Sequence, residues 1–233
     1  MDLFVHVSVH NFQALQAGIA KHTAEGKDLT NLFDAQGNTL MHACVQQNSI
    51  QCLQVVTKHL PALVVKRNPK THAEPLHVAI ATGMLNVVHG LLSANADPNS
   101  LCPDNVVGKI SPLATAVSKG NLPLVSILLN ARAKVDTLTL VLAIRCRNPG
   151  LVSMLLQRST DRSAINGQLS EKEAASLSLR KGSTPLIAAI QLKLHDMVVV
   201  LINVRCVSII FHVNQRCQSQ IWCIPQLTFR RLL

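Results

Sequence analysis

The 233-residue sequence has few aromatic and few charged residues. Phe, Trp and Tyr together make 3% of it, with no tyrosine, and Asp, Glu, Lys and Arg together make 15%. Binding single-stranded nucleic acid calls for aromatic side chains interleaved with cations, and one Trp with five Phe does not supply them. Leu, Val, Ile and Ala must therefore build the core, which suits small repeated layers better than one large globular centre.

The common enzyme motifs are also missing. The sequence has no Gly-rich phosphate loop, no GxSxG elbow and no HExxH. Its seven cysteines form no CxxC pair, and the spacing of His212, Cys217 and Cys223 matches no compact zinc template. We therefore expect no catalytic residue, no metal site, no cofactor and no small-molecule substrate. Unpaired cysteines fit the reducing cytoplasm, with the nucleus as the alternative.

Long apolar runs are absent as well. The most apolar stretch, residues 197–213, is interrupted by Asn203, Arg205 and His212 and falls short of the roughly 20 apolar residues that cross a bilayer. The first residues lack the basic start of a signal peptide. We expect neither a targeting segment nor a membrane span.

What the sequence does contain is a recurring pair of short apolar helices. In residues 74–99, Pro75 occupies a first helical position, Gly83 interrupts the apolar run, and Asn95 is a residue that tolerates the left-handed geometry of a helix end. One such pair cannot bury its apolar side alone, so neighbouring pairs must stack. The small residue of the first helix recurs as Cys44, Ala79, Ala116, Ala143 and Ala189, and a fainter N-terminal copy has Val7 there.

These units resemble the ankyrin-repeat family, whose period is about 33 residues and whose signature is T-P-L-H-x-A. The second unit is the best match, with Pro75, Leu76, His77 and Ala79. The resemblance covers residues 1–203 and implies an all-α fold, a solenoid of stacked helix–turn–helix units joined by short hairpin loops. It further implies that His77, like His42 in the first unit, ties neighbouring repeats together by hydrogen bonds rather than binding a metal.

Side chains at the helix starts are expected to cap them, namely Thr39, Ser111 and Thr184. The fourth unit departs from the family pattern, because Leu138 and Thr139 stand where Thr-Pro is expected, and this predicts a lost cap.

A second departure is an insertion at about residues 157–180, roughly a dozen residues beyond the family period. Ser170 to Glu173 predicts a short capped helix within it. A partner-specific contact and a passive loop both remain open for this segment, and the passive loop is favoured.

The third departure is the tail. Residues 204–233 carry no repeat signature and form a separate segment, for which a splice-variant or gene-model tail, an improvised cap and a membrane anchor remain open.

The resemblance places partners against the hairpin tips and the exposed side of each first helix. By position, the tips contribute Gln36, Asn38, Lys70, Ile110, Arg180 and Lys181, and the helices contribute Gln46, Gln47, Thr82, Ser118, Lys119, Arg145 and Gln191. Every charged residue in this set is positive, and the chain has a net charge of +10, which favours an acidic protein partner over nucleic acid or a membrane. We predict a protein–protein interaction module: an adaptor, scaffold or regulatory subunit. The alternative is the ankyrin region of a larger enzyme or channel that recruits a partner or substrate.

Overall fold

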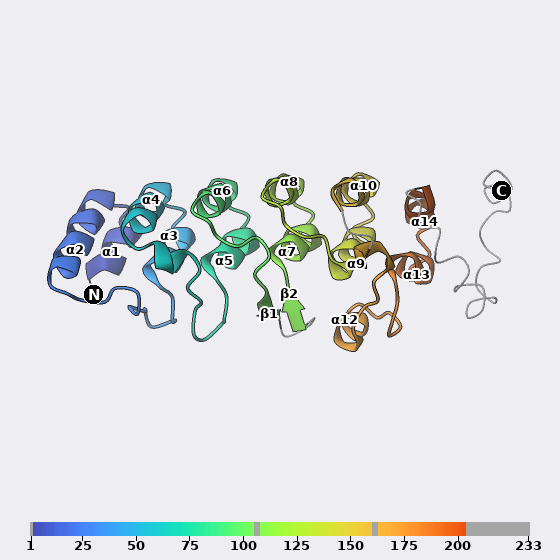
Figure 1. Cartoon of the computed structure of the whole chain (residues 1–233), viewed down its shortest axis with the longest axis horizontal. Helices are drawn as coiled ribbons and strands as arrows, with labels where there is room; N and C mark the ends of the chain where they lie inside the picture. The colour runs from blue at the N-terminus through green and yellow to red at the C-terminus, as the bar shows by residue number, and fades with distance from the viewer. Residues whose placement is uncertain (1, 105–107, 160–162, 204–233) are drawn as a thin grey trace, which may run out of the picture. The chain divides into compact units, whose positions relative to one another are not determined.

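The computed structural model describes residues 2–104, 108–159 and 163–203 (Figure 1). The chain divides into two compact units, Met1–Lys134 and Val135–Leu233, which are described separately here as unit 1 and unit 2. The three interpretations of the tail, and the spacing of His212, Cys217 and Cys223, fall on residues outside the described ranges.

Unit 1 is built from helix pairs. Its helices are α1 (Asp2–Ser8) with α2 (Phe12–Ala24), α3 (Leu40–Gln46) with α4 (Ile50–His59), α5 (Pro75–Thr82) with α6 (Leu85–Ser93), and α7 (Pro112–Ser118) with α8 (Leu122–Asn130). The first helices pack on one another in sequence order, and the second helices do the same, so that unit 1 has two helical layers (Figure 1). The 3₁₀ helix η1 (Pro61–Val64) follows α4. A short antiparallel hairpin, β1 (Cys102–Asp104) with β2 (Gly108–Ile110), precedes α7, and Cys102 is paired with Ile110.

The helix bounds in unit 1 follow from local sequence. The side chains of Asn11, Thr39 and Ser111 each accept the backbone N–H three residues on, which satisfies one of the amides that a helix start leaves unpaired. The small residues predicted inside the first helices, Cys44, Ala79 and Ala116 among them, are fully buried. Their small volume allows α3, α5 and α7 to approach closely, as the sequence predicted.

Unit 2 contains two further helix pairs and the insertion. Its helices are α9 (Thr137–Arg145), α10 (Pro149–Arg158), α11 (Ser163–Asn166), α12 (Glu171–Ser176), α13 (Pro185–Gln191) and α14 (His195–Asn203). The first helices α9 and α13 pack together, and α10 packs on α14. Within the described residues, no helix is long and apolar enough to cross a membrane.

The prediction that the fourth repeat has lost its cap is wrong. The carboxylate of Asp136 accepts the backbone N–H of Thr139 at 2.7 Å, so α9 begins with an N-cap. Asp is as good an N-cap as Thr, and the helix starts one residue before Leu138. The cap is present, supplied by a different residue type.

The favoured interpretation of the insertion, a passive loop, is also wrong. Its capped helix forms as predicted, with the Ser170 N–H donating to Glu173 Oε2 at 2.7 Å. However, Leu169 and Leu177 are buried, and α11 packs on α9. The backbone N–H of Leu169 donates to the carbonyl of Ser183 at 3.0 Å. The insertion is therefore part of the core of unit 2.

Candidate functional site

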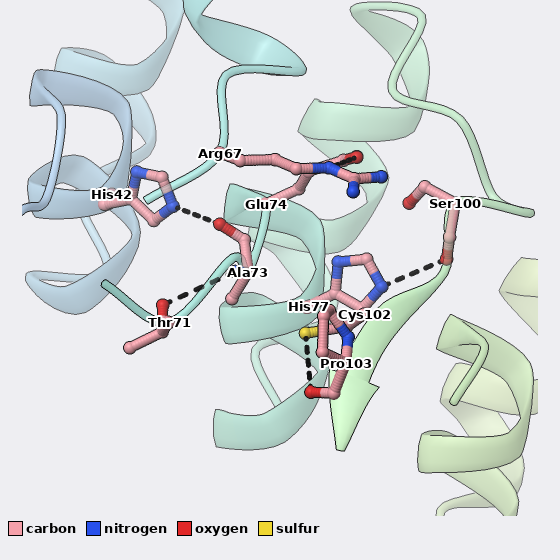
Figure 2. Close-up of polar contacts among 9 residues, drawn as sticks. All are labelled: His42, Arg67, Thr71, Ala73, Glu74, His77, Ser100, Cys102 and Pro103. Atoms are coloured by element: carbon pink, nitrogen blue, oxygen red, sulfur yellow. Dashed lines mark hydrogen bonds and ion pairs between the residues drawn. The ribbon is translucent and has the colours of Figure 1, made fainter. Parts of the chain in front are cut away.

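Two histidines of unit 1 connect successive repeats. His42 Nε2 lies 3.1 Å from the carbonyl oxygen of Ala73 (Figure 2). The Nδ1 of the same ring lies 2.9 Å from the Thr39 hydroxyl and 3.3 Å from the Thr39 backbone nitrogen. Because the N–H can only donate, Nδ1 accepts, and the proton of the neutral ring is on Nε2. Burial lowers the pKa of His42 below its ordinary value of 6.5. The structural role predicted for this histidine is confirmed.

His77 repeats the arrangement with one difference. Its Nε2 lies 3.1 Å from the carbonyl oxygen of Ser100 (Figure 2), and burial lowers its pKa as well. Its Nδ1 is buried and has no hydrogen-bond partner among the described residues. The reason is that Glu74 stands where Thr39 stands in the first repeat. Glu74 does not cap α5 but pairs with Arg67, whose Nε lies 3.1 Å from Glu74 Oε1.

The loops before α3 and α5 interlock through buried amides. Asn38 is 7% exposed; its Nδ2 donates to Asp34 Oδ2 at 3.0 Å, and its Oδ1 accepts from Asn68 Nδ2 at 2.9 Å. Asn68 is itself buried, and its Oδ1 accepts the backbone N–H of Lys70 at 2.8 Å. Gly37 has φ +83, and a Cβ there would lie 2.9 Å from Asn68 Oδ1. The prediction that Asn38 contacts a partner is therefore corrected, because its side chain is buried. Asn38 instead stabilises the loop that contains the exposed Gln36.

The remaining predicted residues of unit 1 lie mostly at the surface. Ile110 is half-buried in β2, and the exposed residues are Gln36, Gln46, Gln47, Lys70, Thr82, Ser118 and Lys119. Two of the lysines reach back one repeat. Lys70 Nζ donates to the carbonyl of Ala35 at 2.6 Å, and Lys119 Nζ donates to the carbonyl of Ala81 in the last turn of α5. The cations of this surface are thus held in place while remaining accessible.

In unit 2 the predicted residues gather around the ends of α9 and α13. Arg145, Arg180 and Lys181 are exposed, and Lys181 Nζ pairs with Glu171 Oε2 at 2.9 Å. Gln191 is half-buried, and its Oε1 accepts the Arg180 N–H at 3.5 Å. This bond ties the loop before α13 to the end of the same helix.

Sequence reasoning missed two basic residues at this surface. Arg147 and Lys193 are exposed and have φ of +51 and +55. Each stands four residues after the small buried residue of its first helix, and Gly83 and Gly120 occupy the same position in unit 1. Aligning the repeats at that position would have found both.

The chemistry available at these surfaces is that of hydrogen bonding and positive charge. No group of three His, Cys, Asp or Glu side chains within the described residues could hold a metal ion. Burial raises the pKa of the Cys44 thiol far above its ordinary value, so this thiol is not a nucleophile.

Comparison with known proteins agrees with this architecture. The family model "Ankyrin repeats (3 copies)" matches residues 11–102. No curated protein sequence matches the chain.

Solved structures of similar fold include three ankyrin repeat domains. The ankyrin repeat domain of Bcl-3, a unique member of the IkappaB protein family, superposes with a TM-score of 0.67 at 19% identity, covering 88% of this chain and 86% of that domain. The human ASB11 ankyrin repeat domain gives 0.56 at 19% identity, with 88% and 84% covered. An ankyrin repeat domain from Acinetobacter baumannii AYE gives 0.66 at 20% identity, with 87% and 97% covered. The chain therefore carries ankyrin repeats, matched as a family over residues 11–102 and by fold over most of its length.

Proposed function

We propose that the chain is a protein–protein interaction module that binds its partner through the exposed ends of its first helices and the loops before them. Ankyrin repeats generally mediate protein–protein interaction, and repeat stacks offer extended binding surfaces. The observation that carries the proposal is the division within the first helices α3, α5, α7 and α9, whose interior residues are buried and whose last residues are exposed. In α3, for example, Met41, Cys44 and Val45 are fully buried, whereas Gln46 and the following Gln47 are exposed. The exposed polar ends have no role in the core and are free to contact another protein.

We further propose that the partner surface is acidic. The exposed cations at these helix ends include Lys119 in unit 1 and Arg145 in unit 2, and the whole chain has 22 basic against 12 acidic residues. Complementary charge accelerates association more than it tightens the final complex. An adaptor, scaffold or regulatory subunit would use such a surface, and so would the recruiting region of a larger enzyme or channel. The buried thiols of Cys44 and Cys52 are unpaired, which agrees with the cytoplasm as the compartment, the nucleus being the alternative.

The test is capture of partners from a lysate of the source cells by the full chain, quantified by mass spectrometry, with two variants of equal charge. Lys119→Glu with Arg145→Glu reverses cations at the proposed surface. Lys21→Glu with Lys58→Glu reverses exposed cations on the second helices α2 and α4, and serves as the control.

The proposal expects a partner that the first variant loses and the control retains. It also expects that added salt slows association of the wild-type chain. Equal loss from both variants, or equal retention by both at unchanged circular dichroism, contradicts the proposed surface.

A further inference from the structure

A left-handed residue follows every first helix in the described part of the chain. The residues and their φ values are His10 (55), Asn48 (51), Gly83 (79), Gly120 (65), Arg147 (51) and Lys193 (55). Glycine adopts this conformation without steric cost, and Asn tolerates it better than most residues. In unit 1, this position is Gly or Asn after α3, α5 and α7, and His10 after α1. In unit 2, it is a long basic residue after both first helices, α9 and α13.

The helix dipoles do not explain the two cations of unit 2. A positive charge is stabilised at a helix C-terminus and destabilised at an N-terminus. Arg147 lies between the end of α9 and the start of α10, and Lys193 lies between the end of α13 and the start of α14, so the two effects oppose each other. Both residues are thus held at a backbone geometry that disfavours a long side chain, and the helix dipoles do not compensate for it.

The two cations follow helices that pack against each other, and neither forms an ion pair within the described residues. Helices α9 and α13 pack against each other (Figure 1), and Arg147 and Lys193 occupy the same position after each. None of the ion pairs in the described ranges involves either residue. The carboxylate of Asp136 is engaged in capping α9, and that of Glu171 in pairing with Lys181. Asp196 lies in the first turn of α14, three residues after Lys193, and forms none of the ion pairs in the described ranges.

We propose that Arg147 and Lys193 form a two-cation clamp for an extended acidic segment of the protein partner, with acidic side chains three residues apart. This inference rests on the proposed function and names the feature that the partner offers. Packed helices are separated by roughly 8–10 Å, which sets the distance between the two turns. In a polyproline II segment, residues i and i+3 lie on the same side, about 9 Å apart. Arg145, exposed at the end of α9, adds to the positive potential that attracts such a segment.

The test is a titration of the full chain with two synthetic, proline-rich peptides of identical composition. Binding is monitored by the chemical shifts of the backbone amides in NMR. One peptide has two Glu residues at i and i+3, and the other has them at i and i+1. The variants are Arg147→Gly and Lys193→Gly, since Gly relaxes the turn that each residue occupies. Arg132→Gly is the matched control, because Arg132 is an exposed cation with φ +64 that follows the second helix α8 in unit 1.

The clamp predicts that the i, i+3 peptide binds more tightly than the i, i+1 peptide and shifts the amides near residues 147 and 193. Each clamp variant weakens that binding by about twofold to fivefold, the range of an exposed ion pair, and Arg132→Gly leaves it unchanged.

Three results overturn the clamp: equal affinity for the two peptides, equal effects of Arg147→Gly and Arg132→Gly, or tighter binding of a single-stranded oligonucleotide with the same dependence on both clamp residues. A failure of the clamp alone is distinguishable from a failure of the proposed function. If the Arg147→Gly, Lys193→Gly double variant captures the cellular partner as well as wild type does, and Lys119→Glu with Arg145→Glu does not, the clamp is wrong and the binding surface stands.

Discussion

Replacing Glu74 by Thr is expected to stabilise unit 1, although it removes an ion pair. Glu74 is the N-cap residue of α5 but makes no capping hydrogen bond, and it leaves His77 Nδ1 buried without a partner among the described residues. Thr39 supplies both interactions to α3 and His42 in the preceding repeat. A Thr hydroxyl at position 74 would do the same for α5 and His77.

The magnitude can be worked from three contributions. A capping hydrogen bond contributes about 1 kcal/mol, and a partner for the buried Nδ1 contributes about 1 kcal/mol more. Against these stands the loss of the pair between Glu74 and Arg67. Because the Arg67 side chain is 49% exposed, solvent screening limits that loss to about 0–1 kcal/mol. The sum is a stabilisation of about 1–2 kcal/mol.

The assay is urea unfolding of the full-length chain, with hydrogen exchange of the α5 amides to localise the effect. Two controls separate the contributions. Arg67→Ala removes the ion pair without adding a cap and should be neutral or mildly destabilising. Thr39→Glu recreates the second-repeat arrangement in the first repeat, and should lower the free energy of unfolding by about 1–2 kcal/mol. If Glu74→Thr leaves the midpoint unchanged or lowers it at an unchanged m-value, the account of the capping histidines is wrong.

Three further predictions concern stability. Burial holds the pKa of His42 below 6.5 in the fold, so as pH falls the unfolded chain binds a proton at this histidine before the folded chain does. The free energy of unfolding should therefore be highest above about pH 6.5 and decline as pH falls below it, and His42→Ala should reduce the slope of that decline. Deleting residues 163–177 should lower the free energy of unfolding by about 3 kcal/mol or more, since Leu169 and Leu177 are buried; an unchanged melting temperature would contradict the contribution of these leucines to the core of unit 2. Gly37→Ala should cost about 1–3 kcal/mol through backbone strain and the approach to a buried amide, and in differential scanning calorimetry it should cost more than Gly26→Ala, where φ is +69 but nothing lies within 4 Å of the added Cβ.

The parts of this fold that the sequence predicts are those with a local signal. Thr39 is recognisable as a cap because the residues that start a helix follow it directly, and Ala79 is recognisable as a packing residue because its position recurs in each repeat. The histidine bonds were predictable from the resemblance. In each case the residue and its partner stand in a fixed relation along the chain.

The parts that the sequence did not predict depend on contacts between distant residues. Asn38 looks like an exposed loop residue, and its burial results from Asn68, thirty residues away in the next loop. Leu169 and Leu177 have no repeat register, so their burial against unit 2 had no pattern to signal it. Asp136 was overlooked because the fourth repeat lacks the Thr-Pro pair that normally marks the helix start.

The central claim, that the exposed ends of the first helices contact the partner, is tested most directly by site-specific photocrosslinking in source cells. A photoreactive residue at Gln46, at the end of α3, is compared with one at Gln54, which is exposed on the second helix α4 of the same repeat. The account predicts that a protein crosslinks from position 46 and not from position 54, and that the yield at position 46 falls with Lys119→Glu and Arg145→Glu. Crosslinking from position 54 alone would contradict it.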